Sequence, residues 1–338
     1  MGNLKYNLNF DKLCKIMRLG DLVREPEAIS GGFLHKMFSV ETTKGKYAVK
    51  ALNPQIMLRP TAMKNIITSE RIAKLASSRI SALPAIIFNG SSIQEVDGQF
   101  FLIFNWVKGK SLKSKEINSI HCIKVGEALA TIHMTNFSEL EISSNSGHAT
   151  EDINWNYYLN MGEENNLEWT NILRENINNL YNWTTEANES AKILSSNMVI
   201  SHRDLDPKNI LWIEDTPIII DWESAGFVNP MHELIEMAIY WSESETGDID
   251  KKRFLEFIRA YKNIFGVLDT NWTMVLLNGF SGKLGWLEYS LKRSLLIECT
   301  DKEEQNMGTN QVTETINSIK HYASMISEVE MWLNNELL

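Results

Sequence analysis

Residues 201–212 have the sequence Ser-His-Arg-Asp-Leu-Asp-Pro-Lys-Asn-Ile-Leu-Trp, and this stretch decides how the rest of the chain is interpreted. It follows a polar segment with helical spacing and precedes an apolar run, residues 217–220, that ends at Asp221. Asp204 stands five residues before Asn209, and Asp221 follows on the far side of a predicted short hairpin. The pattern therefore predicts three oxygen-bearing side chains at the ends of two apolar strands.

Transfer of a phosphoryl group to an alcohol uses residues of these types. A carboxylate orients the attacking hydroxyl and accepts its proton, and oxygen ligands hold Mg²⁺ just beyond it. We expect Asp204 to be the catalytic base, and Asn209 and Asp221 to be the metal ligands. Each residue alone is explained equally well as an ordinary loop, turn or strand-end residue, so the prediction rests on the combination.

Length and composition narrow the class of protein. The chain has 338 residues, with 43% hydrophobic and 22% charged residues, which is typical of a soluble globular protein with two sizeable cores. We expect no membrane span and no signal peptide, because no long apolar run is present. Cys14, Cys122 and Cys299 have no metal-binding spacing, which favours a reducing cytoplasm.

The net charge of −10 hides an asymmetry. Residues 1–107 carry 14 Lys and Arg against 8 Asp and Glu, whereas residues 108–338 carry 19 against 35. A basic first part suits an anionic nucleotide, and an acidic second part suits a cationic molecule and argues against nucleic acid. Solvated acidic helix surfaces are the alternative explanation. We place a nucleotide-binding lobe at residues 1–107 and a helical lobe with the catalytic loop and acceptor site at residues 108–338.

The first lobe is predicted to contain five strands and one main helix. A turn of small residues, Ser30-Gly31-Gly32, precedes a strand ending near residue 42 and a second strand at residues 46–52 that carries Lys50. Glycine amides can approach phosphate closely, so the turn is a candidate phosphate-binding loop and Lys50 a candidate phosphate-binding lysine. An ordinary hairpin would show the same pattern. Further strands are expected at residues 83–88, 92–96 and 99–106.

One helix of this lobe is expected at residues 61–77, after an N-terminal helix at residues 4–18 with Asp11 to Arg18 at its centre. It carries Glu70, which we expect to pair with Lys50 and hold it against the nucleotide phosphates. The alternative is a surface carboxylate that pairs with Lys74. The segment that leaves the lobe could offer backbone groups of Asn105 and Val107 to an adenine edge, or could be a plain connector.

The second lobe is expected to be helical, apart from a hairpin at residues 209–221. Its predicted helices lie at residues 117–133, 167–182, 184–196, 231–241, 254–265, 273–295 and 312–337. The aromatic pair Trp155 and Tyr158 is either core packing or a face for a cationic substrate. Candidate contacts to an amine are the carboxylates of Asp206, Glu223, Glu233 and Glu236.

Residues 201–210 and 219–226, followed by Asn229-Pro230, resemble the aminoglycoside phosphotransferase/choline kinase family. Tyr47-Ala48-Val49-Lys50 and Gly109-Lys110-Ser111-Leu112 resemble that family as well, and the resemblance spans about residues 28–265. It implies a bilobal, protein-kinase-like α+β fold, with a small antiparallel sheet and one main helix in the first lobe and a larger, mostly helical second lobe.

The resemblance also implies site roles and cofactors. Lys50 would bind phosphate, Asp204 would be the base, and Asn209 and Asp221 would hold Mg²⁺, with ATP or GTP as co-substrate. Family members often have His-Gly-Asp at residues 202–204, so the role of Arg203 stays open.

The expected function is transfer of the γ-phosphate to a hydroxyl of a small cationic molecule, foremost an aminoglycoside-type antibiotic. A metabolic kinase for choline, thiamine, a hydroxyl amino acid or a sugar is the first alternative. A protein kinase is disfavoured, because Trp222-Glu223 replaces Phe-Gly and no Ala-Pro-Glu segment follows. A nucleotide-binding module without catalysis is disfavoured by the intact site residues. We expect a cytoplasmic monomer or homodimer with no nucleic-acid or membrane partner.

Overall fold

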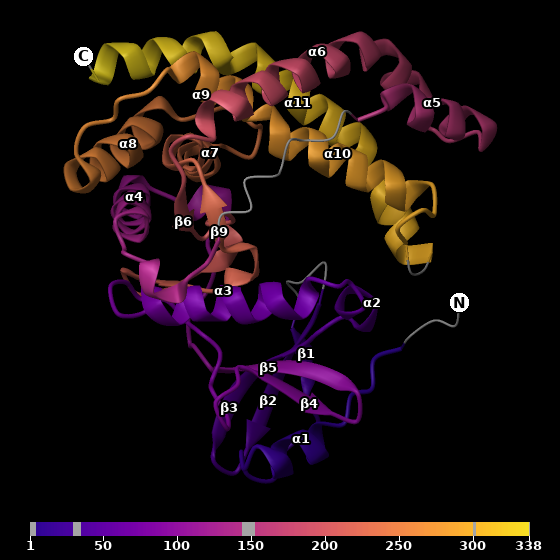
Figure 1. Ribbon diagram of the computed structural model, residues 1–338, viewed down its shortest axis with the longest axis vertical. Helices are drawn as coiled ribbons and strands as arrows, with labels where there is room; N and C mark the ends of the chain where they lie inside the picture. The colour runs from indigo at the N-terminus through magenta and orange to yellow at the C-terminus, as the bar shows by residue number, and fades with distance from the viewer. Residues whose placement is uncertain (1–4, 30–34, 144–152, 300–301, 338) are drawn as a thin grey trace. The chain divides into compact units, whose positions relative to one another are not determined.

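The computed structural model describes residues 5–29, 35–143, 153–299 and 302–337 (Figure 1). The chain divides into two compact units: residues 1–142 with 200–227, and residues 143–199 with 228–338. The predicted catalytic loop therefore belongs to the same unit as the first strands and helices of the chain. The lobe boundary after residue 107 rests on charge and motif order, and it stays a prediction.

The first unit is built on a five-stranded antiparallel sheet. The strand order is β1-β2-β3-β5-β4, so β3 is central. The strands are β1 (Glu27–Ile29), β2 (Lys36–Thr42), β3 (Gly45–Ala51), β4 (Ile93–Val96) and β5 (Gln99–Asn105). In the register, Lys50 of β3 lies between Met37 of β2 and Leu102 of β5. A lysine at this place is held by hydrogen-bonded strands on both sides.

Alternation along the strands buries both faces of the sheet. On one face Phe101 and Ile103 pack with Leu13 of helix α1 (Phe10–Ile16). On the other face Leu102 packs in a separate cluster with Ile66 of helix α3 (Ala62–Ala76), which runs along the sheet (Figure 1). A short helix, α2 (Pro54–Met57), joins β3 to α3. The continuous apolar run of β5 thus supplies side chains to two cores.

The predicted strand at residues 83–88 is wrong, whereas the other four predicted strands and helix α3 are confirmed. Pro84 has no amide hydrogen to offer to a ladder. The segment instead forms isolated hydrogen bonds. Leu83 N–H donates to Ile219 O at 2.9 Å, and Ile86 N–H donates to Ile103 O at 2.7 Å. The fifth strand of the sheet is β1, which the sequence pattern did not reveal.

Two small two-stranded sheets complete the first unit after helix α4 (Ser119–His133). The predicted hairpin is confirmed as β7 (Ile210–Ile213) and β8 (Thr216–Ile219). A second two-stranded sheet, β6 (Val199–Ser201) with β9 (Gly226–Val228), was not expected. Four single turns of 3₁₀ helix also occur: η1 (Ser114–Glu116), η2 (Ser138–Leu140), η3 (Pro207–Asn209) and η4 (Trp222–Ser224).

Gly109 explains how the connecting segment reaches the hairpin. Lys110 and Trp212 exchange backbone hydrogen bonds of 3.2 and 2.9 Å. A Cβ added at Gly109 would lie 3.0 Å from Leu211 Cβ and 3.1 Å from Trp212 O. The absence of a side chain therefore lets residues 109–110 pair with β7.

The second unit is helical in its described residues. It contains α5 (Trp155–Glu164), α6 (Thr170–Leu194), α7 (Pro230–Ser242), α8 (Lys251–Phe265), α9 (Trp272–Asn278), α10 (Phe280–Ser294) and α11 (Lys302–Leu337). Helix α11 packs against α10 and returns along it (Figure 1). Together, the sheet-containing first part and this helical part confirm the predicted α+β class.

Three helix boundaries of this unit differ from expectation. Residues 167–182 and 184–196 form one helix, α6, rather than two, and the last helix begins ten residues earlier than predicted. The predicted helix at residues 273–295 is broken at Gly279 into α9 and α10. No helix in the described part of the chain has the combined length and apolar character needed to cross a bilayer.

The break at Gly279 yields a stability prediction. The Tyr322 hydroxyl donates a 2.5 Å hydrogen bond to Leu276 O, and a Cβ on Gly279 would lie 2.1 Å from that hydroxyl. Gly279→Ala should displace the buried phenol and lower the free energy of unfolding by about 2–4 kcal/mol, measured by urea denaturation.

Gly285→Ala is the matched control, because it lies inside α10 with nothing within 4 Å of the added Cβ. Ala is the better helix former there, so we expect stabilisation of up to about 1 kcal/mol. Equal effects of the two substitutions would contradict the assigned role of Gly279.

Candidate active site

The loop that carries Asp204 is fixed by its own side chains. Asn209 Nδ2 donates to Asp204 Oδ2 at 2.9 Å and to the Asp204 carbonyl at 2.7 Å. The buried His202 accepts from Asp204 N–H through Nδ1, at 3.3 Å, and its Nε2 lies 2.9 Å from Ile220 O. The ring of His202 therefore connects the loop to the strand end.

The hairpin brings Asn209 and Asp221 together. Ile210 pairs with Ile219 in the ladder, and Ile220 N–H donates to Asn209 O at 2.9 Å. Asp221 then adopts a left-handed conformation, with φ 60°, before η4. The eleven intervening residues thus form a hairpin that brings the backbone of Asn209 close to the residue before Asp221.

Lys50 is a buried cation held by two carboxylates. Its Nζ lies 2.6 Å from Asp221 Oδ1 and 2.7 Å from Glu223 Oε2, and its side chain is 7% exposed. Burial alone would lower the pKa of Lys50, but the two carboxylates outweigh it and raise the pKa. Burial likewise opposes ionisation of Asp221, and Lys50 overcomes it and lowers the pKa of that carboxyl. The group is therefore a charged cluster that links β3 to the hairpin.

Glu70 lies on the buried face of α3 but does not form the expected pair with Lys50. Its Oε2 accepts from Ala85 N–H at 2.6 Å, and the described residues show no ion pair between Glu70 and either Lys50 or Lys74. Asp221 and Glu223 approach Lys50 instead. Burial raises the pKa of Glu70 to about 7, although the Ala85 hydrogen bond and the charge of Lys50 oppose this rise.

Burial also perturbs the candidate base. Burial, and next the charge of Asp206, raises the pKa of Asp204 to about 6, against opposition from Lys208 and the Asn209 hydrogen bond. A carboxyl with this pKa is ionised at neutral pH and is a stronger base than an ordinary Asp. The chemistry needed for proton acceptance from an alcohol is present at this position.

The donor set at the hairpin fits a magnesium ion. Both hydrogens of Asn209 Nδ2 are directed at Asp204, which fixes the amide orientation and leaves its carbonyl Oδ1 as the ligand atom. Asp221 supplies carboxylate oxygen, and oxygen ligands of these two kinds suit Mg²⁺. Asn209 and Asp221 would hold such an ion.

Of the other residues predicted to bind the nucleotide, only two are described by the structure. Ser30, Gly31 and Gly32 lie outside the described residues. Asn105 is the exposed last residue of β5, opposite Tyr47, and Val107 follows it half-buried.

Two neighbours of the site had no clear signal in the sequence. His35 accepts from Asn53 N–H at 2.9 Å through Nδ1, and its Nε2 lies 3.7 Å from Glu223. Burial, and then Lys50, lowers the pKa of His35 to about 4. Lys208 lies 2.7 Å from Asp206 and 3.5 Å from Asp204. Spacing along the chain does not indicate either approach, because each depends on the tertiary fold or on local loop geometry.

The candidate amine contacts fall in both units. Asp206 and Glu223 belong to the first unit, with the residues above. Glu233 and Glu236 belong to α7 of the second unit, where Glu233 is fully buried. Each unit thus contains two of the four carboxylates.

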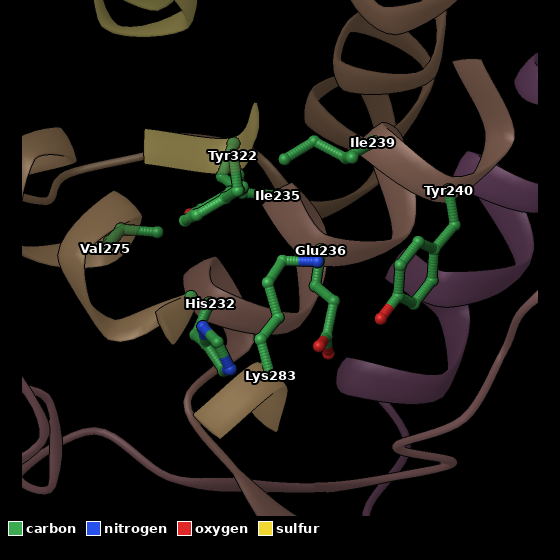
Figure 2. A pocket seen from close by; sticks show the side chains of 9 residues that line it. His232, Ile235, Glu236, Ile239, Tyr240, Val275, Lys283 and Tyr322 are labelled. Atoms are coloured by element: carbon green, nitrogen blue, oxygen red, sulfur yellow. The ribbon is translucent and has the colours of Figure 1, made fainter. Parts of the chain in front are cut away.

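Glu236 lines a small pocket that contains its own cation (Figure 2). Lys283 Nζ lies 5.1 Å from the Tyr322 ring centre and 5.7 Å from that of Tyr240. Burial lowers the pKa of Lys283, and Glu236 and then Glu243 oppose this effect. The pocket carboxylate thus faces an internal ammonium group.

The aromatic candidates of α5 pack inside the second unit. Trp155 is fully buried and donates to Thr184 Oγ1 at 3.0 Å. Tyr158 is 5% exposed and donates to Glu288 at 2.7 Å. Of the two interpretations left open by the sequence, these contacts favour core packing.

Comparison with known proteins places this geometry in a family. The model of the phosphotransferase enzyme family matches residues 25–265. A search of curated protein sequences gave no significant match.

Solved structures share the fold over nearly the whole chain. Spectinomycin phosphotransferase, in complex with ADP and spectinomycin, has a TM-score of 0.67 at 11% identity and covers 95% of this chain and 99% of that chain. Choline kinase from Cryptosporidium parvum Iowa II has a TM-score of 0.59 at 15% identity, with coverage of 97% and 99%. Amicoumacin kinase, in complex with AMP-PNP and Ca²⁺, has a TM-score of 0.61 at 11% identity, with coverage of 92% and 94%.

The family match covers more than half of the chain and includes the motifs at residues 201–210 and 219–226. It also agrees with the kinase-like fold. The chain therefore belongs to the phosphotransferase enzyme family.

Proposed function

We propose that this phosphotransferase moves the γ-phosphate of ATP or GTP to a hydroxyl of a small amine-bearing molecule, with an aminoglycoside-type antibiotic as the first candidate. The observation that carries the proposal is the gathering of Lys50, Asp204, Asn209 and Asp221 in one compact unit. These groups come from segments up to 171 residues apart in the sequence. ADP and AMP-PNP in the similar solved structures support an adenine nucleotide.

The proposed mechanism assigns one task to each group. Lys50 binds phosphate oxygens. Asn209 and Asp221 would hold Mg²⁺, which would supply positive charge to offset that of the triphosphate. Asp204 accepts a hydrogen bond from the acceptor hydroxyl and takes its proton as the oxygen–phosphorus bond forms. The bond between the γ-phosphorus and the β,γ-bridging oxygen breaks, and the nucleoside diphosphate leaves. His202 and Asn209 keep Asp204 in place, and positioning supplies a large part of such catalysis.

The acidic composition of residues 108–338 and the similarity to spectinomycin phosphotransferase favour an amine-bearing acceptor. A metabolic kinase for choline or a related amino alcohol is the second candidate, because the choline kinase fold covers 97% of this chain.

The test is a panel assay of ATP and GTP consumption with spectinomycin, other aminoglycosides, choline, thiamine, a hydroxyl amino acid and a simple sugar, run with wild type and Asp204→Asn. The variant should lower turnover of any accepted substrate by about 10²- to 10⁴-fold, because no base remains at the hydroxyl. Its affinity for Mg-ADP should stay near that of wild type. Full turnover by Asp204→Asn would rule out the base assignment.

The raised pKa of Asp204 predicts the acid limb of the rate profile. Only the ionised carboxylate can accept the proton, so kcat should fall as pH decreases through about 6, rather than through the ordinary range near 4. Below that point we expect a loss of about tenfold per pH unit. Nucleotide affinity measured at each pH separates this effect from binding, and a flat kcat down to pH 5 would contradict it.

Glu70 is proposed to support the nucleotide site from α3, and its burial predicts a pH-dependent stability. Its carboxyl stays protonated in the folded state up to about pH 7 but ionises near 4.5 when unfolded, so the folded state holds more protons in between. Wild type should therefore lose stability relative to Glu70→Gln as pH rises from 4.5 to 7, by on the order of 3 kcal/mol.

Urea denaturation of the ligand-free proteins at pH 5 and pH 8 measures this difference. Glu95→Gln is the control, because Glu95 lies exposed in β4 of the same sheet. A constant difference in stability between wild type and Glu70→Gln would show that Glu70 is ionised throughout.

A further inference from the structure

Lys208 is a cation that lies beside the candidate base, Asp204, and it has no role in the mechanism proposed above. It lies in η3, directly before Asn209. Its Nζ is 2.7 Å from Asp206 Oδ2 and 3.5 Å from Asp204 Oδ1. Asp206 also accepts from Lys208 N–H at 3.0 Å, so one carboxylate fixes both the backbone and the side chain of this lysine.

We propose that Lys208 is a catalytic residue that binds the γ-phosphate and stabilises its charge during transfer. The proposal rests on the proposed function, because it takes Asp204 as the base. It adds a second phosphate-binding lysine to the site, on the acceptor side of the transferred group.

The position of Nζ places it within reach of that group. An acceptor hydroxyl bonded to Asp204 lies about 2.6–3.2 Å from the carboxylate, and the attacked phosphorus lies about 3–3.5 Å beyond the hydroxyl oxygen. Lys208 Nζ starts 3.5 Å from the same carboxylate. Rotation about its side-chain bonds can therefore bring one ammonium hydrogen to a γ-phosphate oxygen while another remains on Asp206.

Charge gives the reason for a cation at this place. Asp204 and Asp206 are two carboxylates beside the position of a triphosphate, and like charges at such distances repel. Lys50 is engaged by Asp221 and Glu223. Lys208 is the cation that pairs directly with both loop carboxylates, so it is placed to offset their charge as the phosphoryl group approaches.

The present contacts of Lys208 are easily exchanged. Its side chain is 57% exposed, and exposed ion pairs contribute little to stability. Exchange of one carboxylate contact for a phosphate contact therefore costs little. A purely structural pair is the competing explanation, and it makes no distinction between nucleotides with and without a γ-phosphate.

The experiment compares the affinities of Mg-AMP-PNP and Mg-ADP by titration calorimetry, which needs no acceptor. Lys208→Met should weaken binding of AMP-PNP by about tenfold and change ADP binding by less than twofold, since a charge-assisted hydrogen bond to the γ-phosphate is lost. Lys208→Arg should keep most of the wild-type ratio of the two affinities. Lys208→Gln serves as a second neutral variant, and thermal unfolding checks the fold of each.

Lys252→Met is the matched control. Lys252 is also an exposed lysine with a carboxylate four residues away, Glu256 at 3.9 Å, but it lies in α8. It should leave both affinities unchanged. An unchanged ratio in both Lys208→Met and Lys208→Gln would overturn the proposal, as would an equal loss for both nucleotides. Failure of wild type to bind either nucleotide would instead overturn the proposed function.

Discussion

The ion pair between Lys50 and Asp221 is the interaction on which the site depends. It joins the central strand of the sheet to the end of the β7–β8 hairpin, at 2.6 Å and in a largely buried place. Loss of one partner from a buried pair leaves an uncompensated charge and costs about 3–5 kcal/mol. The Lys50–Asp221 ion pair and the Ile220–Asn209 hydrogen bond together hold the backbone of Asp221 in its left-handed conformation. The positions of Lys50 and Asp221, the proposed phosphate-binding lysine and a proposed metal ligand, are therefore coupled.

Much of the fold and of the site could be predicted from the sequence where the signal is local. The five-residue spacing of Asp204 and Asn209 and the apolar strand before Asp221 indicated a hairpin that the structure contains. Thr61 and Ser77 bounded helix α3 correctly. The signal failed where distant segments decide the outcome. Residues 83–88 have strand-like composition, but their amides bond to Ile103 and Ile219 singly, and no local pattern encodes those partners.

The partner of Lys50 shows the same limit for the site. Motif order indicated Glu70, and the structure has Asp221 and Glu223. The sequence alone does not show whether a carboxylate on a helix or one after a hairpin will reach Lys50. Only the distances in the folded structure distinguish the two. Glu70 instead satisfies the Ala85 amide, which otherwise would lie buried and unpaired where the chain leaves α3. Glu70 thus accepts a hydrogen bond from the backbone, whereas Asp221 and Glu223 pair with the lysine.

Acidic composition favours an amine-bearing acceptor but does not locate its binding site, because several of the carboxylates are already close to lysines of the chain. Glu223 is engaged by Lys50, Asp206 by Lys208, and Glu236 faces Lys283 across a pocket lined by tyrosines. A cationic substrate would have to displace an internal ammonium group at each of these places, whereas an exposed carboxylate without a nearby lysine offers the same charge at no such cost. Lys283 already has the setting that an amine ligand would use, with two aromatic rings and a carboxylate.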